Sequence, residues 1–469
     1  MELRNRRWTD EEFAAVRREV LSLWPTGQEV DLDEAAAFHR SLKPGQNHAR
    51  KLADARRRGQ TLVQPLAGVA TIQGHTDLML CLQNEGGADV VPTQVDSLTR
   101  TLRFTDAEQG IAESERTGKS KLNGFPIVNH GVHKTRKIVE QLDIPVELRA
   151  GAPDLRLVSE IAFASGHSGF TVGPIYYTMH YSNAVTFEQA IKYFQYIYRL
   201  ASSYEERGVP ITFNVHGSSN AAHFPHSILN AAVILETLLA VEQGAKNVHI
   251  DTRCMGNLVQ DVAAGRIAPR VVEDYCRQFG YDDVQVYRVN KTWAGAFPED
   301  ESRAYALLAF NALTGALAGA DELIIKSVEE AVGVPVKEAN AASIRSVKHT
   351  LDLVKNQRIP LDEKALAIEA EIVEAETRAI VDRVIELGNG DVAVGIVESI
   401  SAGVLDVPFA ASRYCAGRVL VARDKDGAVR FLDPGNIPLP KHVLEYHREK
   451  IAEREALLGT EVGYQTIVD

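Results

Sequence analysis

Cationic and polar side chains recur at the ends of the β-type segments of this 469-residue sequence. They lie at, or just beyond, the carboxyl ends of predicted strands: Arg100, Asn129, His130, Arg149, His216, Arg253 and Lys326. If the strands form a parallel barrel, these side chains share the mouth where barrel enzymes work. Two arginines in one mouth suit a substrate carboxylate, because a guanidinium group binds it through two parallel hydrogen bonds. For any single arginine, the alternative is an ion pair that braces a loop.

No residue set for metal or nucleophilic chemistry accompanies these cations. The sequence has no H-E-x-x-H motif, and none of its four cysteines lies in a C-x-x-C pair. We therefore predict neither a metal site nor a disulfide framework. An anion-binding mouth without acid–base machinery is typical of an enzyme whose cofactor brings the chemistry.

Short β-type runs alternate with helical stretches from residue 61 onward. The predicted strands span residues 61–67, 88–93, 125–129, 146–149, 211–216, 247–252, 284–289 and 321–326. Several are apolar and rich in residues that favour strands, as strands buried on both faces should be. Eight strands with helical crossovers predict an α/β fold, a closed (β/α)8 TIM barrel. The alternative is a doubly wound open sheet, but the G-x-G-x-x-G turn of its dinucleotide-binding versions is missing after the first strand. Residues 165–181, aromatic and glycine-containing, are expected to form a loop that covers the barrel mouth.

The pattern divides the chain into three segments. Residues 1–60 read as helices that precede the barrel, and residues 61–340 form the barrel itself. Residues 341–469 are expected to form an appended α+β region packed on the barrel. That region contains a predicted hairpin over residues 418–432, which turns at Asp424-Lys-Asp-Gly427.

Composition excludes several classes of function. The net charge is −12 and no basic stripe is present, which argues against tight nucleic-acid binding. No apolar run approaches the length of a membrane span, and the charged start of the chain lacks the apolar core of a signal peptide. We therefore expect a cytoplasmic protein that acts on a small molecule.

Ordered, dispersed motifs carry a family resemblance over nearly the whole chain. The motifs are Leu62-Val-Gln-Pro-Leu-Ala-Gly-Val-Ala70, Leu122-Asn-Gly-Phe-Pro126, Gly295-Ala-Phe-Pro-Glu-Asp-Glu-Ser302, Lys326 to Asn340 and Pro408-Phe409. With these, the chain resembles the large catalytic, epsilon-type chain of glutamate mutase, also called methylaspartate mutase. The resemblance implies a (β/α)8 barrel and a radical carbon-skeleton rearrangement that depends on adenosylcobalamin.

The resemblance also implies a partner. In that family a separate small subunit binds the corrin through a D-x-H-x-x-G motif, and this sequence contains no such motif. The implied assembly is a heterotetramer of two large and two small chains, in which this chain forms a homodimer and the active site lies between the two kinds of subunit.

Particular positions inherit roles from the resemblance. Contacts to adenosylcobalamin are implied for Gly68, Asn123, His180, Phe297, Lys326, Glu330 and Val334. Substrate contacts are implied for Arg100, Arg149, Tyr177 and Tyr181, and substrate positions also include Leu66, Ala150 and Thr171. The chemistry itself belongs to the cofactor, so no catalytic side chain is assigned.

Three substrate positions depart from the family. The family carries arginine where this chain has Leu66, histidine at Ala150, and glutamate at Thr171. Cofactor positions are largely kept while substrate positions change, which favours an altered substrate over a dead enzyme. We expect the substrate to be an amino or carboxylic acid related to glutamate, and a Leu66→Arg, Thr171→Glu variant to gain glutamate turnover.

Two alternatives remain open at this stage. A true glutamate mutase would result if His180, His216 or Gln94, which also differ from the family, compensate for the changes. A member without activity would serve only as a scaffold for the cobalamin-binding partner.

Overall fold

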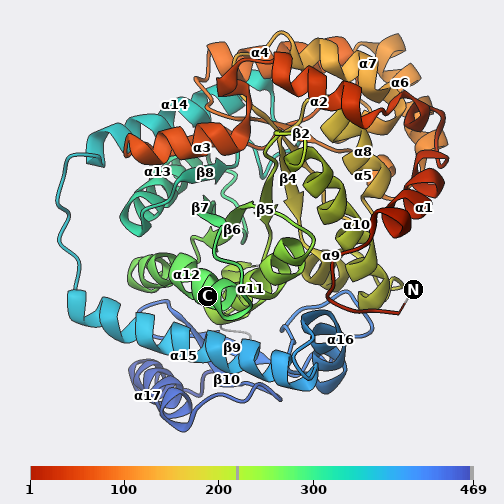
Figure 1. The fold of residues 1–469 in the computed structure, drawn as a ribbon. Coiled ribbons are helices and arrows are strands. Elements are labelled where there is room, and N and C mark those ends of the chain that lie inside the picture. Colours follow the sequence, from red (N-terminus) through yellow and green to blue (C-terminus); the bar gives the residue numbers. More distant parts are fainter. Residues whose placement is uncertain (1, 218–220, 465–469) are drawn as a thin grey trace.

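Eight parallel strands form the centre of the computed structural model, which describes residues 2–217 and 221–464 (Figure 1). The strands are β1 (Leu62–Pro65), β2 (Val91–Gln94), β3 (Val146–Arg149), β4 (Gly169–Val172), β5 (Thr212–Val215), β6 (Asn247–Arg253), β7 (Gln285–Lys291) and β8 (Glu322–Ile325). Their hydrogen-bonded order is β1-β8-β7-β6-β5-β4-β3-β2. The sheet thus curls into a nearly closed barrel, and the predicted (β/α)8 class is confirmed.

The barrel closes at a seam between β1 and β2, the two ends of that order. Two backbone hydrogen bonds cross the seam, from Asp89 N–H to the Val63 carbonyl (3.0 Å) and from Gln94 N–H to the Ala67 carbonyl (3.1 Å). By the alternation of a strand, Pro65 and Pro92 turn their ring nitrogens toward the same seam. Because proline has no N–H to donate, a continuous ladder is interrupted there.

Helices surround the barrel and precede it. The N-terminal group is α1 (Asp10–Leu21), η1 (Pro25–Glu29), α2 (Leu32–Ser41), η2 (Pro44–Gln46) and α3 (His48–Arg57). The helices between strands are α4 (Ile72–Asn84), α5 (Ser97–Arg100), α6 (Phe104–Thr117), α7 (Ile127–Val139), α8 (Arg156–Ala164), α9 (Pro174–Tyr181), α10 (Phe187–Glu205), η3 (Ala221–His223), α11 (His226–Glu242), α12 (Leu258–Gln278) and α13 (Glu301–Ala318). Within the described ranges, no helix combines the length and apolarity that crossing a bilayer requires.

Helix α14 (Lys337–Val354) follows β8 and packs on α13, α4 and β1 as a helix of the barrel. The rest of the C-terminal part lies on another side of the barrel, where α15 (Glu363–Leu387) packs against α11 and α12 (Figure 1). It comprises α15, α16 (Val392–Ala402), the antiparallel hairpin β9 (Leu420–Arg423) and β10 (Val429–Asp433), and α17 (Lys441–Leu458). The predicted hairpin is therefore confirmed. A buried ion cluster fastens it to α15, since Arg430 pairs with both Glu369 and Asp424. The domain boundaries at residues 60 and 340 stay predictions.

Two features of the third and fourth strands were predicted wrongly. Residues 125–129 are not a strand, because Pro126 caps α7 and Phe125 makes only an isolated bridge to Val95. Asn129 and His130 thus lie in a helix, where their side chains bond the backbone carbonyls of Phe104 and Ala70. The true fourth strand lies inside the predicted loop 165–181. Four buried residues that begin with glycine give too short a pattern to identify.

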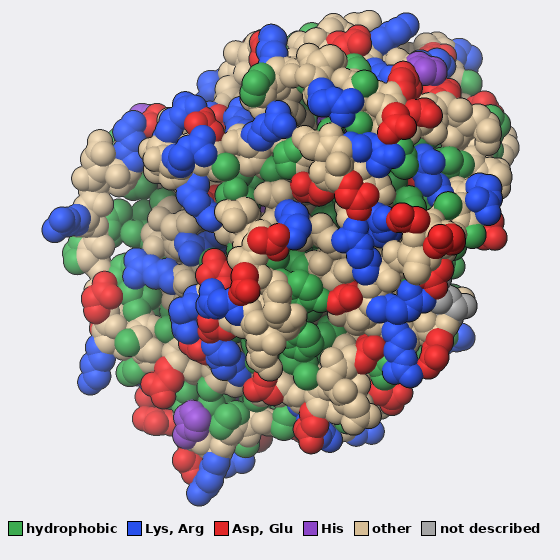
Figure 2. Space-filling model, viewed as in Figure 1, with side chains coloured by type: hydrophobic (Ala, Val, Ile, Leu, Met, Phe, Trp, Pro, Cys, Tyr) green, Lys and Arg blue, Asp and Glu red, His purple; other side chains and the backbone are tan. Residues whose placement is uncertain are grey.

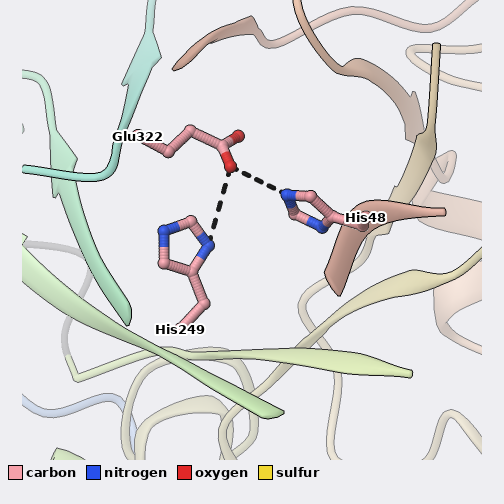
Figure 3. Close-up of side chains that lie close together, drawn as sticks. All are labelled: His48, His249 and Glu322. Atoms are coloured by element: carbon pink, nitrogen blue, oxygen red, sulfur yellow. Dashed lines mark hydrogen bonds and ion pairs between the residues drawn. The ribbon is translucent and has the colours of Figure 1, made fainter. Parts of the chain in front are cut away.

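The amino end of the barrel is closed by a buried polar cluster (Figure 3). His48, the first residue of α3, donates from Nε2 to Glu322 Oε2 of β8 at 2.8 Å. His249 of β6 brings its Nδ1 to 3.7 Å from the same oxygen. These residue types can hold a metal ion, but the hydrogen bond between His48 and Glu322 accounts for their pairing without one. Sequence reasoning missed the group because its members come from three distant elements.

Charge is dispersed over the surface that Figure 2 shows. Lys and Arg side chains alternate there with Asp and Glu, and no continuous basic stripe crosses this face.

Candidate active site

Two adjoining cavities open at the carboxyl ends of the barrel strands. The smaller has a volume of about 340 Å³, and every strand of the barrel, or the segment just after it, supplies a lining residue: Leu66, Gln94, Arg149, Thr171, His216, Arg253, Lys291 and Lys326. The larger has a volume of about 1030 Å³ and lies between the segments that follow β1 and β8. Leu66, Gln94 and Arg100 line both, so the cavities adjoin.

The smaller cavity brings together every residue that was predicted for the substrate. These residues are Leu66, Arg100, Arg149, Ala150, Thr171, Tyr177 and Tyr181. They come from β1, β2, β3, β4 and α9 or the segments beside them. The fold therefore converges all seven positions on one space, as the barrel topology predicts.

Arg149 is held by a buried carboxylate at the cavity floor. Its Nη1 donates to Glu147 Oε1 at 2.7 Å, and both side chains are nearly inaccessible to solvent. The Thr171 hydroxyl donates to the same oxygen at 2.9 Å. Glu147 thus fixes the positions of both the Arg149 guanidinium group and the Thr171 side chain.

Arg100 is positioned differently. It ends the short helix α5, which Asp96 caps by accepting the N–H groups of Leu98 and Thr99. Its guanidinium group reaches only two backbone carbonyls, those of Asp96 (3.4 Å) and Gly151 (3.5 Å). No carboxylate in the described part of the chain forms an ion pair with Arg100, so its charge is available to an anion in the cavity.

Helix α9 places the tyrosines over the cavity. The buried Glu236 carboxyl accepts the N–H groups of Ile175 (2.8 Å) and Tyr176 (3.3 Å) at the start of this helix. Burial raises the pKa of Glu236 well above its usual range. Burial also raises the pKa of Tyr177, so its hydroxyl stays protonated and can donate.

The predicted cofactor residues divide between the two cavities. Gly68, Asn123, Glu330 and Val334 line the larger one. Lys326 lines the smaller one, pairs with Glu330 at 3.0 Å, and lies 5.5 Å from the centre of the Phe297 ring. This ion pair therefore lies where the cavities meet.

His180, although it lies on α9 with Tyr177 and Tyr181, lines neither cavity. Its ring stacks on Phe224 at a centroid distance of 5.7 Å. Burial lowers its pKa to about 4, so its imidazole is neutral near pH 7.

Comparison with known proteins assigns the family. The model of the methylaspartate mutase E chain (MutE) matches residues 42–469. The chain belongs to this family. A glutamate mutase epsilon subunit from Desulfitobacterium hafniense is 45% identical over 100% of this chain and 97% of that protein. Those from Treponema denticola and Fusobacterium nucleatum are 42% and 31% identical, over 100% and 98% of this chain and 96% and 94% of theirs.

Membership in the methylaspartate mutase E chain family fixes the class of chemistry. The chain is an isomerase, the catalytic subunit of a cobalamin-dependent mutase, and an epsilon subunit implies a partner subunit. The alternative of a scaffold without activity is not favoured. A solved synthase from Thermotoga maritima, 3-deoxy-D-arabino-heptulosonate 7-phosphate synthase in truncated form, aligns at a TM-score of only 0.33 and 12% identity, over 63% of this chain and 87% of that one.

The larger cavity of this mutase chain fits a sizeable organic group. Its volume is in the range of pockets that bury small molecules, and Asn123 and Glu330 offer hydrogen-bonding groups in its lining. The backbone of the chain itself leaves no space for a side chain at Gly68. A Cβ atom at this position would lie 2.5 Å from the Gln94 carbonyl oxygen, which β1 and β2 hold in place.

Sequence reasoning missed two residues that shape the smaller cavity. Lys291 ends β7, two residues beyond the predicted strand end at 289, so it was not counted among the mouth residues. For Lys291, the alternation of Val-Tyr-Arg-Val-Asn-Lys over residues 286–291 could have indicated that β7 extends to residue 291. Glu147 lies in the middle of β3, and whether its side chain points into the barrel depends on the register of that strand.

Proposed function

We propose that this chain, with a separate cobalamin-binding subunit, rearranges the carbon skeleton of a carboxylic acid related to glutamate, using adenosylcobalamin. One observation carries the proposal. The smaller cavity gathers all seven predicted substrate positions, and three of these differ from the family, while the adjoining cavity is lined by four of the predicted cofactor positions, Gly68, Asn123, Glu330 and Val334.

The chain's own residues would hold the adenosyl group at the junction of the cavities. Lys326 and Glu330, paired at 3.0 Å, can exchange this bond for bonds to ribose hydroxyls, and Asn123 offers an amide in the lining of the larger cavity. When bound, adenosylcobalamin supplies the radical that removes a hydrogen atom from the substrate and later returns it. The protein's part is to orient both ligands and exclude water.

The substrate side is cationic at Arg100 and Arg149. Arg100 has only carbonyl partners, so a substrate carboxylate gives it the charge-assisted bonds that it lacks. Leu66 and Ala150 place apolar side chains in the cavity lining at positions where the family has arginine and histidine, so fewer polar groups face the substrate. Thr171 carries no charge, so a substrate ammonium would find no carboxylate at this position.

We further propose that the partner is a small subunit that carries D-x-H-x-x-G, in a cytoplasmic heterotetramer of two large and two small chains. Three valines in the segment after β8 support a docking surface there. Val332, Val334 and Val336 are exposed by 65%, 66% and 53%, and the last two line the larger cavity. Adjacent exposed apolar side chains beside a ligand cavity favour a covering partner.

The test is a turnover assay with the small partner, adenosylcobalamin and L-glutamate, read by NMR for 3-methylaspartate. Product at rates typical of enzymes would show that the changes at positions 66, 150 and 171 are compensated, so the substrate is glutamate itself. Absence of product, together with a cob(II)alamin signal in electron paramagnetic resonance when related acids are screened, would support an altered substrate. Absence of both from every acid would refute the proposal.

A further inference from the structure

The smaller cavity is lined by cations and by no anion. Among its described lining residues, the charged side chains are Arg100, Arg149, Arg253, Lys291 and Lys326, and neither aspartate nor glutamate is present. A ligand that enters this space meets positive charge on more than one side. It meets no carboxylate that could pair with a positive group of its own.

The cations stand on opposite walls. Arg100 and Arg149 come from the β2 and β3 side of the barrel, whereas Arg253 ends β6 and Lys291 ends β7. In the strand order, β4 and β5 separate the two pairs on one side, and β8 and β1 separate them on the other. A ligand of moderate length can therefore contact both pairs at once.

The β6–β7 wall has two cations for one carboxylate. Asp251 Oδ2 lies 2.8 Å from Arg253 Nη2 and 3.4 Å from Lys291 Nζ, and it also accepts the Gly217 N–H at 3.3 Å. Arg253 and Lys291 are both buried. Two buried cations that share one anion leave an unbalanced charge, which a further carboxylate would neutralise.

His216 connects the two cations. Arg253 Nη2 donates to His216 Nε2 at 3.2 Å, so the imidazole proton lies on Nδ1, which is 3.4 Å from Asp251 Oδ2 and also contacts Lys291 Nζ. Burial and the two cations lower the pKa of His216 well below its usual range, so the imidazole is neutral. Burial, chiefly, also lowers the pKa of Lys291, and an anion beside its amine would reverse part of that shift.

We propose that Arg253 and Lys291 form a second carboxylate subsite, so that the substrate is a dicarboxylic acid that carries no ammonium group within this cavity. One carboxylate binds Arg100 and Arg149, and the other binds Arg253 and Lys291 across the mouth. The inference rests on the proposed function for the reaction, but it names the substrate class from the charges of the cavity alone.

Equilibrium titration of the full chain with three small acids tests the subsite. Glutarate carries two carboxylates, pentanoate carries one on a chain of equal length, and L-glutamate adds an ammonium group to glutarate. We expect glutarate to bind at least about tenfold more tightly than either of the others. Equal affinity for glutarate and pentanoate, or tighter binding of L-glutamate, would overturn the proposal, and so would failure of all three to bind.

A variant pair adds a second measurement. Lys291→Met should weaken glutarate by about tenfold and leave pentanoate unchanged, because only the dicarboxylate reaches the second subsite. Lys246→Met removes an exposed lysine next to the other end of β6 and should change neither affinity. Equal losses for both acids in Lys291→Met would contradict the subsite. The wild-type comparison stands even if that variant misfolds, and the titration needs no cobalamin, so its outcome is independent of the turnover assay.

Discussion

Restoring the family's glutamate at position 171 should fail unless Glu147 is changed as well. The Thr171 hydroxyl lies 2.9 Å from Glu147 Oε1 in a nearly inaccessible part of the barrel. A carboxylate at 171 would therefore lie about 4 Å from that of Glu147. Two like charges at this distance repel by about 4 kcal/mol at an effective dielectric constant of about 20. This corresponds to about three pKa units.

Urea unfolding at two pH values measures this repulsion. Thr171→Glu alone should lose up to about 3–4 kcal/mol of unfolding free energy at pH 8, because Arg149 already pairs with Glu147 and the other cations of the cavity offset only part of the repulsion. The loss should be smaller at pH 5, because one carboxyl of the pair then stays protonated in the folded state. The sign follows from linkage: a carboxyl whose folded pKa is raised binds more protons folded than unfolded, so stability falls as pH rises from about 4.3 toward the folded pKa.

The matched variant is Glu147→Gln combined with Thr171→Glu. It keeps the acceptor for Arg149 and replaces the lost charge, so most of the stability should return. With Leu66→Arg added, this triple variant should gain glutamate turnover, whereas Leu66→Arg, Thr171→Glu should gain little. If Thr171→Glu alone is as stable at pH 8 as the double variant, the predicted repulsion does not exist and the reasoning is refuted.

Three further predictions concern stability. Glu236→Gln keeps an acceptor for α9 and should change the unfolding free energy by less than about 1 kcal/mol, whereas Glu236→Ala should cost about 2–4 kcal/mol in urea unfolding, and equal costs would contradict a protonated carboxyl. Burial lowers the pKa of His48, but the Glu322 carboxylate more than offsets this, so the folded pKa is raised. The raised pKa contributes stability below about pH 6.5, and this stability is lost as pH rises through the folded value. His48→Gln should remove this pH dependence from a series of unfolding curves. Gly68→Ala should lower the unfolding free energy by about 1–3 kcal/mol, with Gly45→Ala as the control because its nearest neighbouring atom is 3.8 Å away, and an unchanged melting temperature for Gly68→Ala would show that the Gln94 carbonyl can move.

The barrel could be predicted from sequence because seven of its strands leave a clear signal. Residues 247–252 alternate polar residues with Val, Ile and Thr, and residues 321–326 centre on Leu-Ile-Ile, which are both patterns of a strand. The fourth strand left none, since Gly169–Val172 is short and follows polar residues. Residues 125–129 gave a false signal, because a short apolar run at a helix start resembles a strand.

Sequence predicted the site residues whose location depends only on being at the end of a strand. It did not predict those whose location depends on the register of the strand. Residues that follow a strand directly, such as Arg149, meet at the mouth in any barrel of this topology. Glu147 and Lys291 depend on which face of a strand they occupy and on where that strand ends. Asp251 and Arg253 share one face of β6 through the alternation of the strand, whereas the pairing of Asp251 with Lys291 joins two strands and no local pattern in the sequence predicts it.

The proline-interrupted seam between β1 and β2 gives the barrel a built-in line of weakness. Each other pair of neighbouring strands is joined by a ladder of backbone hydrogen bonds. Between β1 and β2, two backbone hydrogen bonds take the place of that ladder. The segments that carry Leu66, Gly68 and Gln94 border this line, and they wall the larger cavity. The segments beside the larger cavity can therefore move apart for a smaller free-energy cost than the other strands. Amide hydrogens of β1 and β2 should exchange with solvent faster than those of β6 and β7.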